Sequence, residues 1–203
     1  FGIEDPTAEF ISQLVAGTKR GKGSKIGFVK ETDQQELIKR PELPPLVIDA
    51  DGLKLLVRIP NWAAHLPPQT ILTPHPGEMS VLTGLSLAEI QDARLQIAQR
   101  FSQEWGHIVI LKGAFTVIAS PEGETAVIAV ASPALARAGS GDVLAGLVVG
   151  LLAQGILPFE AAVAGAWIHA QAGLLAADDL GSSNAVLAGD ILDSSIDILS
   201  ELS

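Results

Sequence analysis

Residues 46–53 read LVIDADGL, and this short apolar run followed by carboxylates is the pattern from which the fold follows. The same arrangement returns in ILTPHPGE at residues 71–78 and in IVILKG at residues 108–113. Short apolar runs bounded by turn residues are typical of fully buried strands. We therefore predict three buried strands, each of which delivers polar side chains at its C-terminal end.

Helical patterns between these strands predict a mainly parallel sheet. Ser86 and Glu89 form the Ser-x-x-Glu capping box of a single helix that is expected to run to Gly106, just before the third strand. Strands that alternate with helices form parallel sheets with right-handed crossovers, and ligands bind such sheets outside the carboxyl ends of the strands. The three polar strand ends are therefore expected to converge on one edge of the sheet.

The remaining sequence adds a hairpin and further helices. Residues 115–119 and 125–130 flank the turn sequence SPEGE and predict a β-hairpin appended to the sheet. Helices are expected at residues 6–16, 141–154, 158–177 and 187–199. The basic stretch at residues 17–30 is expected to be a solvated loop. We see no linker, and so predict one α/β domain over residues 1–203.

Composition narrows the classes of function. The formal net charge of -10 argues against nucleic acid as a partner, because binding to phosphate backbones requires clustered Lys and Arg. The longest apolar stretch, residues 143–157, falls short of the roughly 20 residues that a membrane span needs. There are no cysteines and no basic, apolar leader, so a cytoplasmic location is expected. An anionic substrate would have to be held by local positive potential.

The sharpest local motif is AGSGD at residues 138–142, which opens an apolar helix. Glycines at a helix N-terminus let backbone amides approach an anion, and the helix dipole adds positive potential. In the first turn, Asp142 would be placed to take a proton from a hydroxyl that attacks a bound phosphate. The alternative is that Asp142 only caps its helix while the glycines turn the chain. These residues alone do not decide between the two.

The other strand ends also carry open alternatives. Lys112 and the amides that follow it either contact a nucleotide or are solvated. Two prolines and a glycine fix the backbone around His75 and Glu78, which favours a site, although a capped helix start with exposed side chains explains the same residues. Asp49 binds metal or substrate, or caps the next helix. His169 lies in an apolar helix and is expected to be a core or interface histidine with satisfied hydrogen bonds.

Taken in order, four motifs resemble those of the ADP/ATP-dependent NAD(P)H-hydrate dehydratases, a family of the ribokinase-like superfamily. They are VIDADGL at 47–53, TPHPGEM at 73–79, LKGAFTVI at 111–118 and AGSGDVLAG at 138–146. The resemblance implies a three-layer ribokinase-like domain and a hydro-lyase. This enzyme class phosphorylates the ring hydroxyl of hydrated NADH or NADPH at the expense of ADP or ATP, and then eliminates phosphate to restore the cofactor.

The resemblance also implies site residues. Asp142 matches the catalytic base and a substrate contact, His75 matches a contact to the hydrated nicotinamide, and Asp49 is assigned to the substrate as well. Glu78 matches the glutamate that organises Mg²⁺ in related small-molecule kinases. The implied nucleotide-binding residues are Lys112, Gly113, Ala114, Phe115, Thr116, Gly139, Ser140 and Gly141.

The chain departs from the family at its beginning. The family's domain normally starts with further strands and a glycine-rich segment, so we expect an N-terminally incomplete domain, and a complementary N-terminal segment as a possible partner. Homo-oligomers are expected through the alanine-rich helix at 161–177. Two rival functions remain open: a ribokinase-like kinase for a vitamin-precursor alcohol, and a non-catalytic nucleotide-binding module. His75 stands where such kinases usually carry Asn, and this favours the dehydratase.

Overall fold

The computed structural model describes residues 5–16 and 43–202. The basic stretch at residues 17–30 and its predicted loop lie outside these ranges. Within the described ranges, no helix is both long enough and apolar enough to cross a membrane. The described strands form a single five-stranded sheet.

The sheet runs in the order β1-β2-β3-β4-β5, which is also the order of the chain. Its parallel strands are β1 (Val47–Ile48), β2 (Ile71–Leu72) and β3 (Ile108–Leu111). The antiparallel hairpin of β4 (Thr116–Ala119) and β5 (Thr125–Ile128) continues the sheet from β3. The predicted parallel sheet with an appended hairpin is confirmed.

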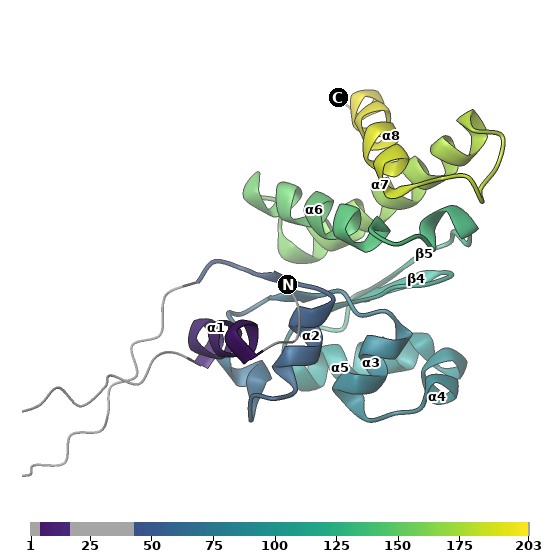
Figure 1. Ribbon diagram of the computed structural model, residues 1–203. Helices are drawn as coiled ribbons and strands as arrows, with labels where there is room; N and C mark the ends of the chain where they lie inside the picture. Colours follow the sequence, from purple (N-terminus) through teal and green to yellow (C-terminus); the bar gives the residue numbers. More distant parts are fainter. Residues whose placement is uncertain (1–4, 17–42, 203) are drawn as a thin grey trace, which may run out of the picture.

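Helices cover both faces of the sheet, giving three layers (Figure 1). One face carries α6 (Ser140–Ala153) and α7 (Pro158–Asp179), with α8 (Ala188–Glu201) packed on α7. The other layer contains α1 (Asp5–Ala16), α2 (Asp51–Leu56), α3 (Pro76–Thr83), α4 (Leu87–Asp92) and α5 (Arg94–Trp105). Short 3₁₀ turns occur at η1 (Trp62–His65) and η2 (Pro133–Leu135). The expected three-layer architecture is confirmed.

Strand β3 is apolar at every position because both of its faces are covered by helices. Side chains alternate across a strand, so Ile108 and Ile110 pack with Val148 of α6 on one face. Val109 and Leu111 pack with the helices on the opposite face. All four residues of β3 are buried, as expected for a parallel strand that is covered on both sides.

The predicted single helix from Ser86 to Gly106 is wrong in one respect. The capping box of Ser86 and Glu89 and the C-terminal Gly106 are present, but the helix breaks at Ala93 into α4 and α5. The backbone of Ala93 leaves the helical region, with φ -134° and ψ 40°. The break makes Arg94 the first residue of α5, and its guanidinium there donates to the Leu111 carbonyl at 2.8 Å. A contact so distant in sequence leaves no signal in the local helical pattern.

The packing of α7 on α6 predicts opposite effects for two glycine substitutions. A Cβ at Gly165 of α7 would lie 2.7 Å from Val148 Cγ2 and 3.3 Å from the Val148 backbone nitrogen, whereas a Cβ at Gly150 of α6 would meet nothing within 4 Å. We expect Gly165→Ala to lower the free energy of unfolding by about 1–3 kcal/mol through overpacking. The control, Gly150→Ala, should raise it by up to about 1 kcal/mol. Chemical denaturation checks both, and a stabilised Gly165→Ala variant would contradict the packing.

Candidate functional site

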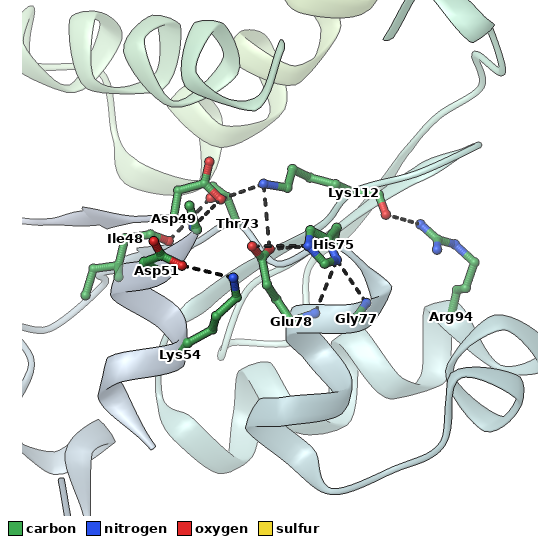
Figure 2. A network of polar contacts seen from close by, with 11 residues as sticks. Ile48, Asp49, Asp51, Lys54, Thr73, His75, Gly77, Glu78, Arg94 and Lys112 are labelled. Carbon is green, nitrogen blue, oxygen red and sulfur yellow. Dashed lines mark hydrogen bonds and ion pairs between the residues drawn. The ribbon is translucent and has the colours of Figure 1, made fainter. Parts of the chain in front are cut away.

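The carboxyl ends of the three parallel strands meet at one edge of the sheet, as predicted. β1 leads into Asp49, β2 leads through Thr73 and Pro74 into His75, and β3 leads into Lys112. Backbone hydrogen bonds continue beyond the strands, because the Lys112 amide donates to the Pro74 carbonyl at 2.9 Å. The polar side chains that follow the three strands therefore share one small region (Figure 2).

An ion network around Lys112 occupies the centre of this region (Figure 2). Lys112 Nζ lies 2.5 Å from Asp49 Oδ1 and 3.9 Å from Glu78 Oε2. The side chains of Lys112, Asp49 and Glu78 are only 18%, 13% and 4% exposed, so water screens their charges poorly. One ammonium therefore balances two carboxylates across the ends of β1 and β3 and the first turn of α3.

His75 and Glu78 cap α3 reciprocally. His75 Nδ1 accepts from the amides of Gly77 at 2.9 Å and Glu78 at 3.2 Å, while Glu78 Oε2 accepts from the His75 amide at 2.8 Å. Because Nδ1 of the neutral ring accepts these bonds, the ring proton is on Nε2. That nitrogen lies 3.2 Å from Glu78 Oε1, and about half of the His75 side chain is exposed. The capped helix start, which the sequence offers as the alternative to a functional site at His75 and Glu78, is present. Because the cap uses Nδ1, it leaves Nε2 as the nitrogen of His75 that can donate.

The N-terminus of α6 lies beside the same network. The Ser140 amide donates to the Arg137 carbonyl, but the amides of Gly141 and Asp142 have no acceptor among the described residues. A Cβ at Gly141 would come within 3.3 Å of both Lys112 Nζ and Asp49 Oδ2. The absence of a side chain at Gly141 therefore lets a helix terminus, with its free amides and positive potential, approach Lys112 closely.

Two cavities flank the junction where the N-terminus of α6 approaches Lys112. A cavity of about 720 Å³ contains most of the predicted nucleotide-binding residues in its wall, together with His75. Those residues are Lys112, Gly113, Ala114, Thr116, Ser140 and Gly141. A second cavity, of about 330 Å³, is lined by Asp49, Asp142 and apolar side chains of α1 and α2. Asp142 and Gly141, neighbours in the first turn of α6, thus face different cavities.

Three predicted site residues do not line either cavity. The Phe115 side chain is mostly exposed, Gly139 supplies the left-handed N-cap of α6 with φ 86°, and Glu78 is buried beneath Lys112. The larger cavity also contains Arg137, which the sequence analysis missed. Arg137 Nη2 donates to the Asn184 carbonyl, and its Nε has no partner among the described residues. Its place two residues before Gly139 is the signal that could have identified it.

The carboxylates suit magnesium only in part. The described residues contain no group of three His, Asp or Glu side chains placed to hold a metal ion. Magnesium in nucleotide sites is usually held by one or two carboxylates, with phosphates and water as the other ligands. Asp49 and Glu78, both in contact with Lys112, are a donor set of that size. The residues therefore fit a magnesium ion that arrives with a nucleotide, and do not form an all-protein metal cage.

His169 is buried on α7 and forms part of the wall of the larger cavity. The prediction of a histidine with satisfied hydrogen bonds is wrong, because its Nε2 has no partner among the described residues. Burial lowers the pKa of His169 to about 4, with a smaller contribution from the nearby charge of Lys112, while a backbone hydrogen bond at Ser140 opposes the shift. The imidazole is therefore neutral near pH 7.

Comparison with known proteins places this geometry in a family. The family model described as NAD(P)H-hydrate dehydratase matches residues 29–196. A bifunctional NAD(P)H-hydrate repair enzyme, Nnr, from Moorella thermoacetica is 44% identical over 159 residues, which cover 78% of this chain and 30% of that protein. An ADP-dependent (S)-NAD(P)H-hydrate dehydratase from Neisseria meningitidis is 41% identical, over 72% of this chain and 50% of its own length. The chain thus spans half or less of these two relatives.

Solved structures agree with this placement. The ADP/ATP-dependent NAD(P)H-hydrate dehydratase of Bacillus subtilis, co-crystallised with ATP and Mg²⁺, superposes with a TM-score of 0.64 and 30% identity, over 68% of this chain and 50% of that one. A ribokinase-like superfamily protein from Enterococcus faecalis has a TM-score of 0.73 at 23% identity, over all of this chain and 61% of its own. The second likeness supports the ribokinase-like fold alone.

The lowered pKa of His169 predicts a pH-dependent stability. The ring binds a proton below about pH 6.5 when unfolded but only below about pH 4 when folded, so the unfolded state binds more protons between these values. Stability from this residue is therefore complete above about pH 6.5 and is lost as the pH falls to about 4, by roughly 3 kcal/mol. In His169→Gln, the free energy of unfolding should fall less steeply over this window. Parallel curves for the variant and the wild type, from denaturation at several pH values, would contradict the assignment.

Proposed function

Because the chain belongs to the NAD(P)H-hydrate dehydratase family, we propose that it dehydrates hydrated NADH or NADPH at the expense of ADP or ATP. The observation that carries the proposal is the first turn of α6, where Gly141 faces one cavity and Asp142 faces the other beside the Lys112 network. A group transferred between two bound molecules needs such a junction. Two cavities that share one helix N-terminus suit phosphoryl transfer better than simple nucleotide binding.

We assign the larger cavity to the nucleotide and the smaller one to the hydrated nicotinamide. The free amides of the α6 terminus and the Lys112 ammonium supply positive potential for phosphate groups in a chain of net negative charge. The smaller cavity joins the carboxylates of Asp49 and Asp142 to an apolar wall, which suits a ring that carries a hydroxyl. His75 lines the larger cavity and not the smaller one, with Nε2 3.2 Å from Glu78 Oε1, so we propose that it meets the substrate where the two cavities adjoin.

The proposed chemistry is a phosphorylation followed by an elimination. Asp142 accepts the proton of the ring hydroxyl while the hydroxyl oxygen forms a bond to the terminal phosphorus of the nucleotide. The bond from that phosphorus to the bridging oxygen breaks, and AMP leaves from ADP or ADP leaves from ATP. The ring nitrogen then donates its electron pair as the carbon–oxygen bond breaks and phosphate departs. Loss of a proton from the neighbouring ring carbon restores the dihydropyridine. Phosphorylation is needed because hydroxide is a poor leaving group near neutral pH.

The chain's own groups stabilise charge during transfer. The amides of Gly141 and Asp142 and the ammonium of Lys112 lie where negative charge develops on the phosphoryl oxygens. Magnesium, when it binds with the nucleotide, supplies further neutralisation of the phosphates. We propose that Glu78 would help to hold that ion, since the hydrogen bond from the His75 amide already fixes the position of its carboxylate.

We further propose two kinds of partner. Strand β1 pairs with β2 on one side, and no described strand pairs with its other edge, so this edge suits an N-terminal segment that completes the sheet. The alanine-rich helix expected to form the oligomer contact is α7, and most of its small residues are buried against α6 and α8. We therefore propose α8 instead, because Leu192, Ile196 and the adjacent Leu187 are exposed, which suits a second copy of the chain. Light scattering of the chain tests the oligomer, and a concentration-independent monomer would reject it.

A single domain and a cytoplasmic location remain predictions.

Removing the proposed base should slow turnover strongly. We expect Asp142→Asn to lower kcat by about 10²–10⁴-fold, because a side-chain amide cannot accept the hydroxyl proton. The assay follows dihydronicotinamide absorbance as the hydrate is incubated with ADP or ATP and Mg²⁺. Asp193→Asn, an exposed carboxylate on α8, is the control and should retain full activity.

The same assay separates the rival functions. Unchanged turnover in Asp142→Asn would contradict its role as base. A wild-type chain that forms a stable phosphorylated vitamin-precursor alcohol and restores no NADH would instead be a small-molecule kinase. Nucleotide binding without turnover of either substrate would leave only a binding module.

A further inference from the structure

Arg94 holds the end of β3 from outside both cavities. As the first residue of α5, it directs Nη2 to the carbonyl oxygens of Leu111 at 2.8 Å and Lys112 at 3.3 Å. Nη1 donates to Gln91 Oε1 at 3.1 Å, which fixes the plane of the guanidinium from the preceding helix. Figure 2 shows Arg94 reaching the Lys112 backbone from the side opposite to the Lys112 ammonium.

Gly113 is fitted to the same guanidinium. Its φ is +142°, and a Cβ there would lie 3.2 Å from both Nη1 and Nη2 of Arg94. The guanidinium thus hydrogen-bonds to Leu111 and Lys112 and occupies the space that a side chain at Gly113 would need, at the point where the buried strand becomes the wall of the larger cavity. From this point the Lys112 side chain turns toward Asp49, and the backbone continues along the cavity.

We propose that Arg94 is a positioning residue for nucleotide binding, which acts by fixing the backbone of Lys112 and Gly113. This inference rests on the proposed function, because it takes the larger cavity as the nucleotide site. Arg94 does not line that cavity among the described residues, so its effect passes through the two residues that do. A guanidinium suits the task because its planar fork reaches neighbouring carbonyl groups while keeping a fixed orientation.

A purely structural role predicts a different result. If Arg94 only stabilised the fold, its loss would lower the unfolding midpoint and leave the affinity for nucleotide unchanged. A positioning role instead predicts weaker nucleotide binding, a higher KM for the nucleotide and little change in the KM for the hydrated dinucleotide. The two roles therefore differ in which ligand is affected.

The experiment compares three variants of the full chain by calorimetric titration with ADP and by steady-state kinetics. We expect Arg94→Met to raise the Kd for ADP about tenfold, as loss of a charged hydrogen bond implies. Arg94→Lys keeps the charge without the fork and should give a smaller increase. The control is Arg100→Met, on the same helix, because the Arg100 side chain is 65% exposed and its contacts, with Glu104 at 3.7 Å and the Phe101 ring at 4.8 Å, lie within α5. It should bind ADP as the wild type does.

A second substitution keeps the test decisive if Arg94→Met does not fold. Gly113→Ala places a methyl group against the guanidinium and should also weaken ADP binding. If both Arg94→Lys and Gly113→Ala bind ADP with an affinity within twofold of the wild type, the inference is overturned. Wild-type affinity in a folded Arg94→Met would overturn it equally. A wild-type chain that binds ADP but restores no NADH would contradict the proposed dehydratase function alone, because the affinity comparison does not depend on turnover.

Discussion

The contact between the Lys112 ammonium and the carboxylates of Asp49 and Glu78 is the interaction on which the site depends. Without the ammonium, the poorly screened carboxylates of Asp49, after β1, and Glu78, in the first turn of α3, would lose the positive charge that balances them. Removing one partner of a buried ion network usually costs more than the network contributes as a whole. The network also needs Gly141, because any side chain there would press on Lys112 and Asp49. The ion network and the lack of a side chain at Gly141 therefore fix the positions of the ends of β1 and β3, and of α3 and α6, relative to one another.

Much of this arrangement could be predicted from the sequence because parallel strands obey simple rules. The apolar runs at Val47–Ile48, Ile71–Leu72 and Ile108–Leu111 are strands, and the residues that follow them meet at one edge. Once the strands are parallel, their carboxyl ends must lie together, whatever the connecting segments do. The prediction therefore needed only the direction of the strands and not their detailed packing.

What the sequence could not reveal depends on contacts between distant residues. The break at Ala93 has no glycine or proline to mark it, and its clearest consequence is the hydrogen bond from Arg94 to Leu111, 17 positions away. His169 has the sequence context of any core histidine, and only the structure shows that Nε2 has no partner among the described residues. His75 illustrates a subtler case, since its position in a capping sequence was visible but the nitrogen used for capping was not.

The sequential order of the sheet bears on how the chain reaches this structure. Each described strand pairs with the next one along the chain, so no strand has to be inserted between two others that have already paired. Pairings between successive strands keep loop-closure entropy low and generally allow faster folding than pairings between distant strands. The antiparallel pairs β3–β4 and β4–β5 have the shortest connections, residues 112–115 and 120–124, and are expected to form first, with β2 and β1 added in turn. Pulsed hydrogen exchange during refolding would then show amides in β4 and β5 protected before those of β1, so that the edge carrying Asp49 is the last part of the site to be ordered.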